Sequence, residues 1–107
     1  MWNIQTDSEL RKVARDLAET TASERVIVFG SRARGDATKD SDLDLALVFP
    51  VGADLRMGLR KAHRALWPRR FPIDVVALSA RTWRERSTAL AREIAEHGVT
   101  LYSRDGS

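Results

Sequence analysis

The sequence predicts an α/β fold in which helices flank a small mixed β-sheet. Two apolar runs with strand character, residues 26–29 and 42–49, are joined by a polar segment, and a third run follows at 71–78. Around these runs, apolar residues recur at the three- and four-residue spacing of amphipathic helices. A chain of 107 residues has room for one core, so we expect residues 1–107 to form a single domain.

The first half of the chain predicts a helix and two strands. Thr6 to Glu9 match a capping box, and apolar residues continue at helical spacing to about residue 20. The run 26–29 predicts a buried strand, and Gly30 and Ser31 mark the sharp turn that ends it. A glycine at this turn allows backbone amides to come close to a phosphate group.

The second strand is predicted at 42–49 and carries two acids. Its alternation places Leu43, Leu45 and Leu47 on one face and Asp42, Asp44 and Ala46 on the other. The two carboxylates therefore point the same way, about 7 Å apart along the strand. They repel each other unless a cation lies close, and Mg²⁺ prefers carboxylate and phosphate oxygens.

The second half predicts a long helix, a strand and two short helices. Asp54 can cap the long helix, and Asp74 lies in the otherwise apolar strand at 71–78. Ser79 and Ser87 can cap helices at about 80–86 and 87–97. Gly98 ends the last helix, and residues 99–102 predict a short final strand.

Asp74 adds a third carboxylate to the acid pair. If its strand lies beside the strand of Asp42 and Asp44, the three acids converge on one place, enough to hold two metal ions roughly 4 Å apart. Such a site promotes in-line displacement at phosphorus. Each motif alone is weak, but the turn, the gap, the acid pair and the third acid occur together and in order.

These motifs resemble the nucleotidyltransferase superfamily typified by DNA polymerase beta. Phe29-Gly30-Ser31 supplies the turn, ten residues supply the gap, and Asp42-Leu43-Asp44 and Ile73-Asp74-Val75 supply the acids. Within the superfamily the chain looks most like the minimal nucleotidyltransferases (MNT proteins), the MntA-like antitoxins paired with HEPN toxins. The spelling Gly-Ser-Arg-Ala-Arg-Gly followed by Ser-Asp-Leu-Asp-Leu is typical of that branch.

The resemblance implies a role for each site residue. Asp42 and Asp44 would hold two Mg²⁺ ions, and Asp74 would complete the site of the ion that activates the attacking oxygen. Gly30 and Ser31 would contact the phosphates of a nucleoside triphosphate, and Arg34 would neutralise phosphate charge. The implied reaction transfers AMP from ATP to a tyrosine hydroxyl of a HEPN-family toxin, with pyrophosphate leaving.

Two other functions stay open on the sequence. The chain could be an antitoxin that neutralises its partner by steric binding, without catalysis. It could also be a transferase for a small molecule such as an aminoglycoside, although such enzymes usually carry an extra helical domain, for which we expect no room here.

Composition and charge bound the partners and the location. The net charge is +3 and the pI is near 9.9, but no long basic tract and no row of basic and aromatic residues occurs, so we expect no direct nucleic-acid binding. The chain has no cysteine, no signal-peptide pattern and no apolar run of bilayer length. We therefore expect a cytoplasmic protein without membrane contact.

One charged pattern has two interpretations. Arg56, Arg60 and Arg64 form a stripe along the predicted long helix. The interpretation that the sequence favours is an ordinary solvated helix face. The other is a docking surface for an acidic partner, or a reach toward the triphosphate.

Overall fold

The computed structural model describes residues 7–30, 43–66 and 73–106. Three of the predicted site residues, Ser31, Arg34 and Asp42, lie outside these ranges. Gly30, Asp44 and Asp74 lie within them.

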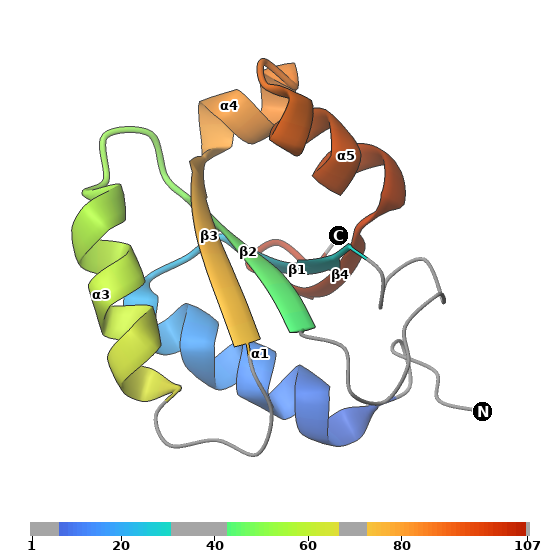
Figure 1. Ribbon diagram of the computed structural model, residues 1–107. Coiled ribbons are helices and arrows are strands. Elements are labelled where there is room, and N and C mark those ends of the chain that lie inside the picture. The colour runs from blue at the N-terminus through green and yellow to red at the C-terminus, as the bar shows by residue number, and fades with distance from the viewer. Residues whose placement is uncertain (1–6, 31–42, 67–72, 107) are drawn as a thin grey trace.

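The described strands form one mixed sheet with the order β3-β2-β1-β4 (Figure 1). They are β1 (Arg25–Phe29), β2 (Leu43–Phe49), β3 (Ile73–Ser79) and β4 (Val99–Ser103). β1 is antiparallel to both β2 and β4, whereas β2 and β3 run parallel. The predicted α/β fold with a mixed sheet is confirmed.

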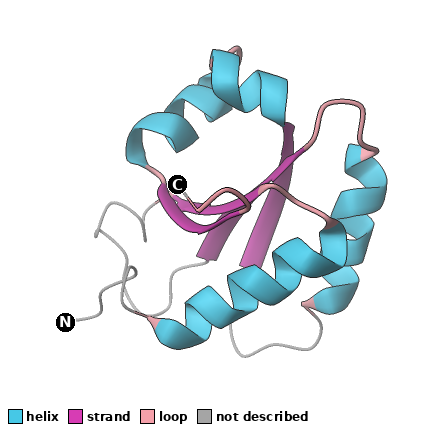
Figure 2. Cartoon of the chain, turned by 180° about the vertical axis from the view of Figure 1, so that it is seen from behind, coloured by secondary structure: helices cyan, strands magenta, loops and turns pink. Residues whose placement is uncertain are grey.

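Helices cover both faces of the sheet. α1 (Ser8–Thr21) and α3 (Leu55–Ala65) pack on one face, and α4 (Ala80–Glu85) and α5 (Ala89–His97) lie on the other (Figures 1 and 2). The β2 side chains that face α1 and α3 are Leu43, Leu45, Leu47 and Phe49, all buried. Ala46 and Val48 face α4 and α5. The predicted alternation along β2 therefore separates the two layers of the core.

Two of the predicted helix starts are confirmed. The carboxylate of Asp54 accepts a hydrogen bond from the backbone N–H of Met57 at 3.0 Å, and α3 begins at the next residue. The hydroxyl of Ser79 accepts from the backbone N–H of Thr82 at 3.0 Å in the same way for α4. Each cap satisfies one backbone donor that the first helical turn leaves without an internal partner.

The other two helix starts were predicted one residue too early. Asp7, not Thr6, caps α1, because its carboxylate accepts from the N–H of Leu10 at 3.0 Å. Thr88, not Ser87, caps α5, because its hydroxyl accepts from the N–H of Ala91 at 3.0 Å. In both cases two adjacent residues could cap, and only the position of the following turn selects between them.

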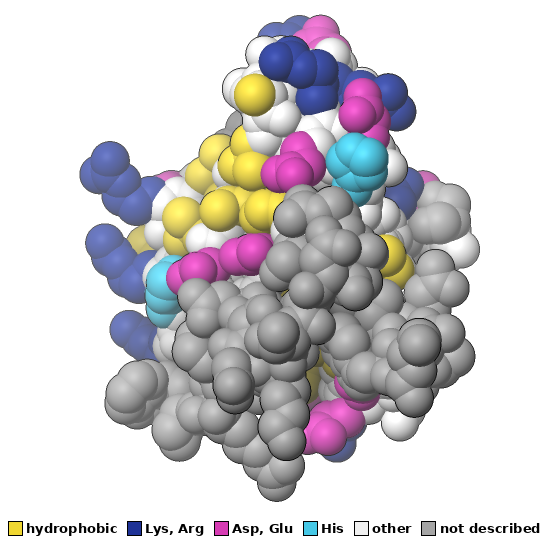
Figure 3. Space-filling model, turned by 45° about the vertical axis from the view of Figure 1, so that its right-hand side comes forward, with side chains coloured by type: hydrophobic (Ala, Val, Ile, Leu, Met, Phe, Trp, Pro, Cys, Tyr) yellow, Lys and Arg dark blue, Asp and Glu magenta, His cyan; other side chains and the backbone are white. Residues whose placement is uncertain are grey.

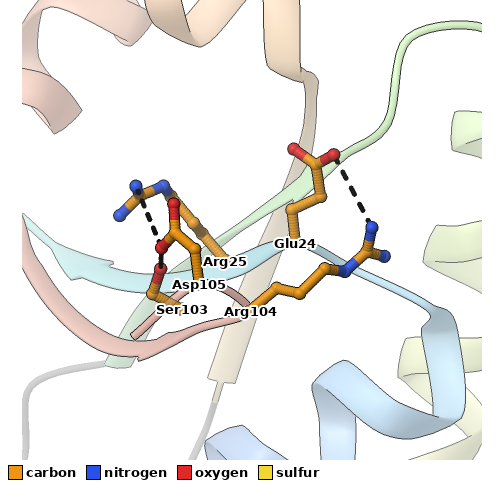
Figure 4. A network of polar contacts seen from close by, with 5 residues as sticks. All are labelled: Glu24, Arg25, Ser103, Arg104 and Asp105. Carbon is orange, nitrogen blue, oxygen red and sulfur yellow. Dashed lines mark hydrogen bonds and ion pairs between the residues drawn. The ribbon is translucent and has the colours of Figure 1, made fainter. Parts of the chain in front are cut away.

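Polar contacts tie the chain end after β4 to the start of β1 (Figure 4). The guanidinium of Arg25 lies 3.8 Å from the carboxylate of Asp105, which also accepts a hydrogen bond from Ser103. The guanidinium of Arg104 lies 3.9 Å from the carboxylate of Glu24. These contacts lie where β1 begins and β4 ends, at the end of the sheet away from Gly30.

No helix within the described part of the chain is both long enough and apolar enough to cross a membrane.

Candidate active site

Asp44 lies at the beginning of β2, on the face of the sheet that α4 and α5 cover. Its main-chain neighbour on β1 is Phe29, whose side chain belongs to the core cluster on that same face. Asp44 is half-buried, whereas Ala46 and Val48, the next residues along the same face, are fully buried. Asp44 therefore stands where the apolar layer between the sheet and α4–α5 ends.

Asp74 lies directly opposite Asp44 on the neighbouring strand. The parallel register of β2 and β3 pairs Leu43 with Ile73 and Asp44 with Asp74. Opposite residues on adjacent strands point to the same face, and such strands lie about 4.8 Å apart. The structure thus brings these two acids together, although 30 positions separate them in the chain.

Gly30 ends β1 against the side chain of Asp44. Its φ of +78° lies in the left-handed region, which glycine adopts without the strain that a Cβ would bring. A Cβ added at position 30 would overlap Oδ2 of Asp44 and lie 3.3 Å from its Cγ. Glycine is therefore required here for two separate reasons: the conformation of the turn and the space that the Asp44 carboxylate fills.

The contact between Gly30 and the Asp44 carboxylate was not predicted from the sequence. The sequence predicts only that a turn at Gly30 ends the strand and allows a phosphate to approach the backbone. The contact with Asp44 depends on the antiparallel register of β1 and β2, which pairs Phe29 with Asp44. The sequence pattern that could have indicated this contact is a glycine directly after one strand and an acid at the start of the next.

The two described carboxylates form a donor set that suits a hard divalent cation. Two acids held side by side at one register position repel each other, and an ion bound by both removes that repulsion. Oxygen ligands of this kind fit Mg²⁺. Within residues 7–30, 43–66 and 73–106 no third histidine, cysteine or acid completes a metal-binding group. The predicted third acid, Asp42, lies outside the described ranges, as do Ser31 and Arg34.

The fold and these residues define the class of protein. The mixed sheet places Asp44 and Asp74 on the parallel strands β2 and β3, and the turn at Gly30, which ends β1, contacts Asp44. The family model described as "Nucleotidyltransferase domain" matches residues 8–100, which include every element from α1 to the start of β4. The chain belongs to this nucleotidyltransferase family.

Solved structures share the fold. A protein from Sulfolobus solfataricus assigned as a nucleotidyltransferase is 25% identical, with a TM-score of 0.61, and the match covers 91% of this chain and 83% of that one. A toxin-antitoxin structure with AMP-PNP is 20% identical, with a TM-score of 0.64 and coverage of 87% and 73%. A variant of the toxin-antitoxin MntA-HpeT with two aspartate-to-glutamate changes is 20% identical, with a TM-score of 0.58 and coverage of 89% and 71%. No protein with a curated description matches the chain significantly.

Proposed function

We propose that this chain is a Mg²⁺-dependent antitoxin that transfers AMP from ATP to a tyrosine hydroxyl of a HEPN-family toxin. The observation that carries the proposal is the pairing of Asp44 with Asp74 at one register position, beside the turn at Gly30. Membership of the nucleotidyltransferase family supports the reaction type. Two of the structures with the same fold are toxin-antitoxin structures, one of them with an ATP analogue, and they support the choice of partner and nucleotide.

The proposed site consists of Asp42, Asp44 and Asp74 with Gly30, Ser31 and Arg34. Alternation along β2 would place Asp42 on the same face as Asp44, next to Asp74. The three acids would hold two Mg²⁺ ions, which supply charge neutralisation for the triphosphate and for the attacking oxygen when bound. Gly30 and Ser31 would hold the phosphates through the turn, and Arg34 would balance their charge.

In this site the chain itself does mainly binding and orientation. The acceptor hydroxyl attacks the α-phosphate, the bond from the α-phosphorus to the bridging oxygen breaks, and pyrophosphate leaves. In this proposal the hydroxyl proton would pass to a carboxylate of the three acids, which would act as the general base. Strand positions hold Asp44 and Asp74 rigidly, and this rigidity keeps the reacting atoms in line.

The experiment that tests the proposal combines the purified chain, the toxin from the adjacent reading frame, Mg²⁺ and ATP labelled on the α-phosphate. We expect the toxin to gain the label and lose its toxicity, and mass spectrometry to place AMP on a tyrosine. The double variant Asp42→Asn, Asp44→Asn should still bind the toxin but transfer no label. If cells stay protected by this variant, neutralisation is steric and the proposed mechanism is wrong.

The alternative with a small acceptor is tested in the same reaction. Aminoglycosides replace the toxin, and transfer of label to the drug by the isolated chain would favour that function over the proposed one.

A further inference from the structure

The outward face of α3 is strongly basic. Positions 56, 57, 60, 61 and 64 fall within an arc of about 140°, at 100° per residue. We call this arc the α3 surface; its members are Arg56, Met57, Arg60, Lys61 and Arg64, all exposed. The opposite side of the helix carries the buried Gly58 and Ala62. No acid occurs anywhere in Leu55–Ala65, so the α3 surface has four positive charges and no internal counter-charge.

No described side chain supplies that counter-charge. Ion pairs in the described part of the chain include those of Arg25, Arg81, His97 and Arg104, and none of these four residues lies on α3. Like charges four positions apart on a helix repel each other, as Arg56, Arg60 and Arg64 do here. On the sequence alone, the favoured interpretation of this stripe is a solvated helix face, but such a face usually carries both acidic and basic side chains.

Apolar side chains accompany these charges. Met57 is 43% exposed within the α3 surface, and Val51, in the turn before the helix, is 64% exposed. The only other exposed large apolar side chain in the described part of the protein is Leu90 on α5, across the sheet. Arginine and methionine are enriched in protein interfaces, where their long side chains contribute both charge and contact area.

These neighbours favour a protein over a nucleic acid as the partner. Binding of single strands depends on aromatic side chains that stack on bases, and none of the described exposed large apolar residues is aromatic. The four cations also span only about 12 Å of helix, the rise over eight residues, so they contact few phosphates.

The α3 surface extends toward the candidate active site. α3 connects two parallel strands, so it runs back along the sheet, and its last turn lies at the end where β3 begins with Ile73 and Asp74 (Figure 1). In Figure 3, Lys and Arg side chains lie one above another along one margin of the molecule, and acidic side chains lie further in from that margin. α3 packs on the face of the sheet opposite to the one that carries Asp44 and Asp74, so a partner bound at α3 reaches these acids around the edge of the sheet, where β3 is the outermost strand.

We infer that the α3 surface is the docking surface for the protein that receives the nucleotide, and that this partner presents an acidic face with an apolar contact for Met57. The inference rests on the proposed function, because it takes the acceptor to be a protein. Charge complementarity speeds encounter and sets orientation, and the orientation brings an acceptor hydroxyl toward Asp44 and Asp74.

The test uses the double variant Arg60→Glu, Arg64→Glu in the full chain. Its control is Arg84→Glu, Arg92→Glu, which changes two exposed arginines on α4 and α5, across the sheet. Both variants lower the net charge by four, from +3 to −1, so overall charge is matched. Arg64 and Arg84 each lie in the last turn of their helix, so these two changes are matched in their relation to the helix dipole. A neutral variant, Arg60→Gln, Arg64→Gln, covers the case in which the glutamates impair folding.

Binding to the purified toxin of the adjacent reading frame is measured by calorimetry, and binding of Mg²⁺ and ATP to the isolated chain is measured alongside. We expect the α3 variants to weaken toxin binding by at least about tenfold, with less effect at high salt, and to leave nucleotide binding unchanged. The control variant should bind the toxin like the unchanged chain. Acid-to-lysine changes on the toxin should restore binding to the glutamate variant.

Equal toxin binding by the unchanged chain and the α3 variants overturns the inference. Binding to single-stranded RNA is measured as well, and the inference is also overturned if the α3 variants lose only RNA binding and still bind the toxin. The two proposals fail in different ways. Tight, α3-dependent binding without any AMP transfer removes the proposed chemistry and keeps the docking surface, whereas transfer that is indifferent to α3 does the reverse.

Discussion

The phenyl ring of Phe49 lies against the backbone of Gly58. Phe49 ends β2 and is 2% exposed, and Gly58 lies in the first half of α3 on its buried side. A Cβ at position 58 would lie 2.7 Å from Cε1 of the ring and even closer to Cζ. This contact sets how near α3 approaches the sheet, and so it also fixes where the α3 surface stands relative to Asp44 and Asp74.

Replacing Gly58 with alanine should therefore destabilise the protein. Alanine favours the helix by about 1 kcal/mol, but overlap with a buried ring costs about 1–3 kcal/mol, and we expect the cost of the overlap to exceed the gain because the ring is fully buried. Urea unfolding should show a lower midpoint for Gly58→Ala. In a Phe49→Leu background, where the smaller side chain leaves space, the same change should cost less or stabilise. An equal cost in both backgrounds would contradict the packing explanation.

Replacing Gly30 with alanine should affect both stability and function. The left-handed conformation costs a residue with a Cβ about 1–2 kcal/mol, and the new methyl group would push the Asp44 carboxylate aside. Gly52 is a matched control, because its φ is +90° but nothing lies within 4 Å of an added Cβ. We expect both Gly30→Ala and Gly52→Ala to lower the unfolding free energy, Gly30→Ala by more because its methyl group overlaps Asp44, and only Gly30→Ala to abolish label transfer. Normal transfer by Gly30→Ala would show that the position of Asp44 is not critical.

Removing one of the paired acids should raise stability when no metal is bound. Opposed like charges on adjacent strands cost about 0.2–1 kcal/mol, so Asp74→Asn should unfold at a slightly higher temperature in EDTA. Added Mg²⁺ should raise the melting temperature of the unchanged chain and have little effect on the variant, because a bound cation offsets the repulsion only where both acids are present. The control is Asp16→Asn, an exposed position on α1. Equal Mg²⁺ effects on all three proteins would argue against a metal at Asp44 and Asp74.

At the end of the sheet away from Gly30, replacing Arg25 should lower the unfolding free energy more than replacing its ion-pair partner Asp105. Its guanidinium carbon lies 4.7 Å from the centre of the Trp83 ring, and its side chain is 19% exposed, whereas that of Asp105 is 70% exposed. An exposed ion pair contributes about 0–1 kcal/mol, so Asp105→Ala should cost little. Arg25→Ala should cost about 1–2 kcal/mol, because the contact with the indole and the packing of the arginine stem are lost as well. Thermal unfolding at low and high salt separates the contribution of the ion pair from that of the packing against Trp83, since only the ion pair weakens with salt.

The tertiary structure decided several features that local sequence left undetermined. Which of two adjacent residues caps α1 or α5 depends on where the first turn settles, and so Asp7 and Thr88 replaced the predicted caps. The contacts of Gly30 with Asp44 and of Gly58 with Phe49 join residues on different elements, and no periodicity reports such an approach. The charge environment of α3 was also decided by the tertiary structure, because the sequence shows the arginines of this helix but not whether acids from other elements lie near them.

The sequence by itself determined the class of fold, the alternation of β2 and the positions of Asp44 and Asp74 within their strands. These follow from periodicity, since a strand with one apolar face has only one way to turn its leucines inward, and that choice directs Asp44 to the other face. It could not determine that Asp44 and Asp74 share one register position. That pairing results from the parallel alignment of β2 and β3, which the crossover through α3 and the packing of its buried side set at long range.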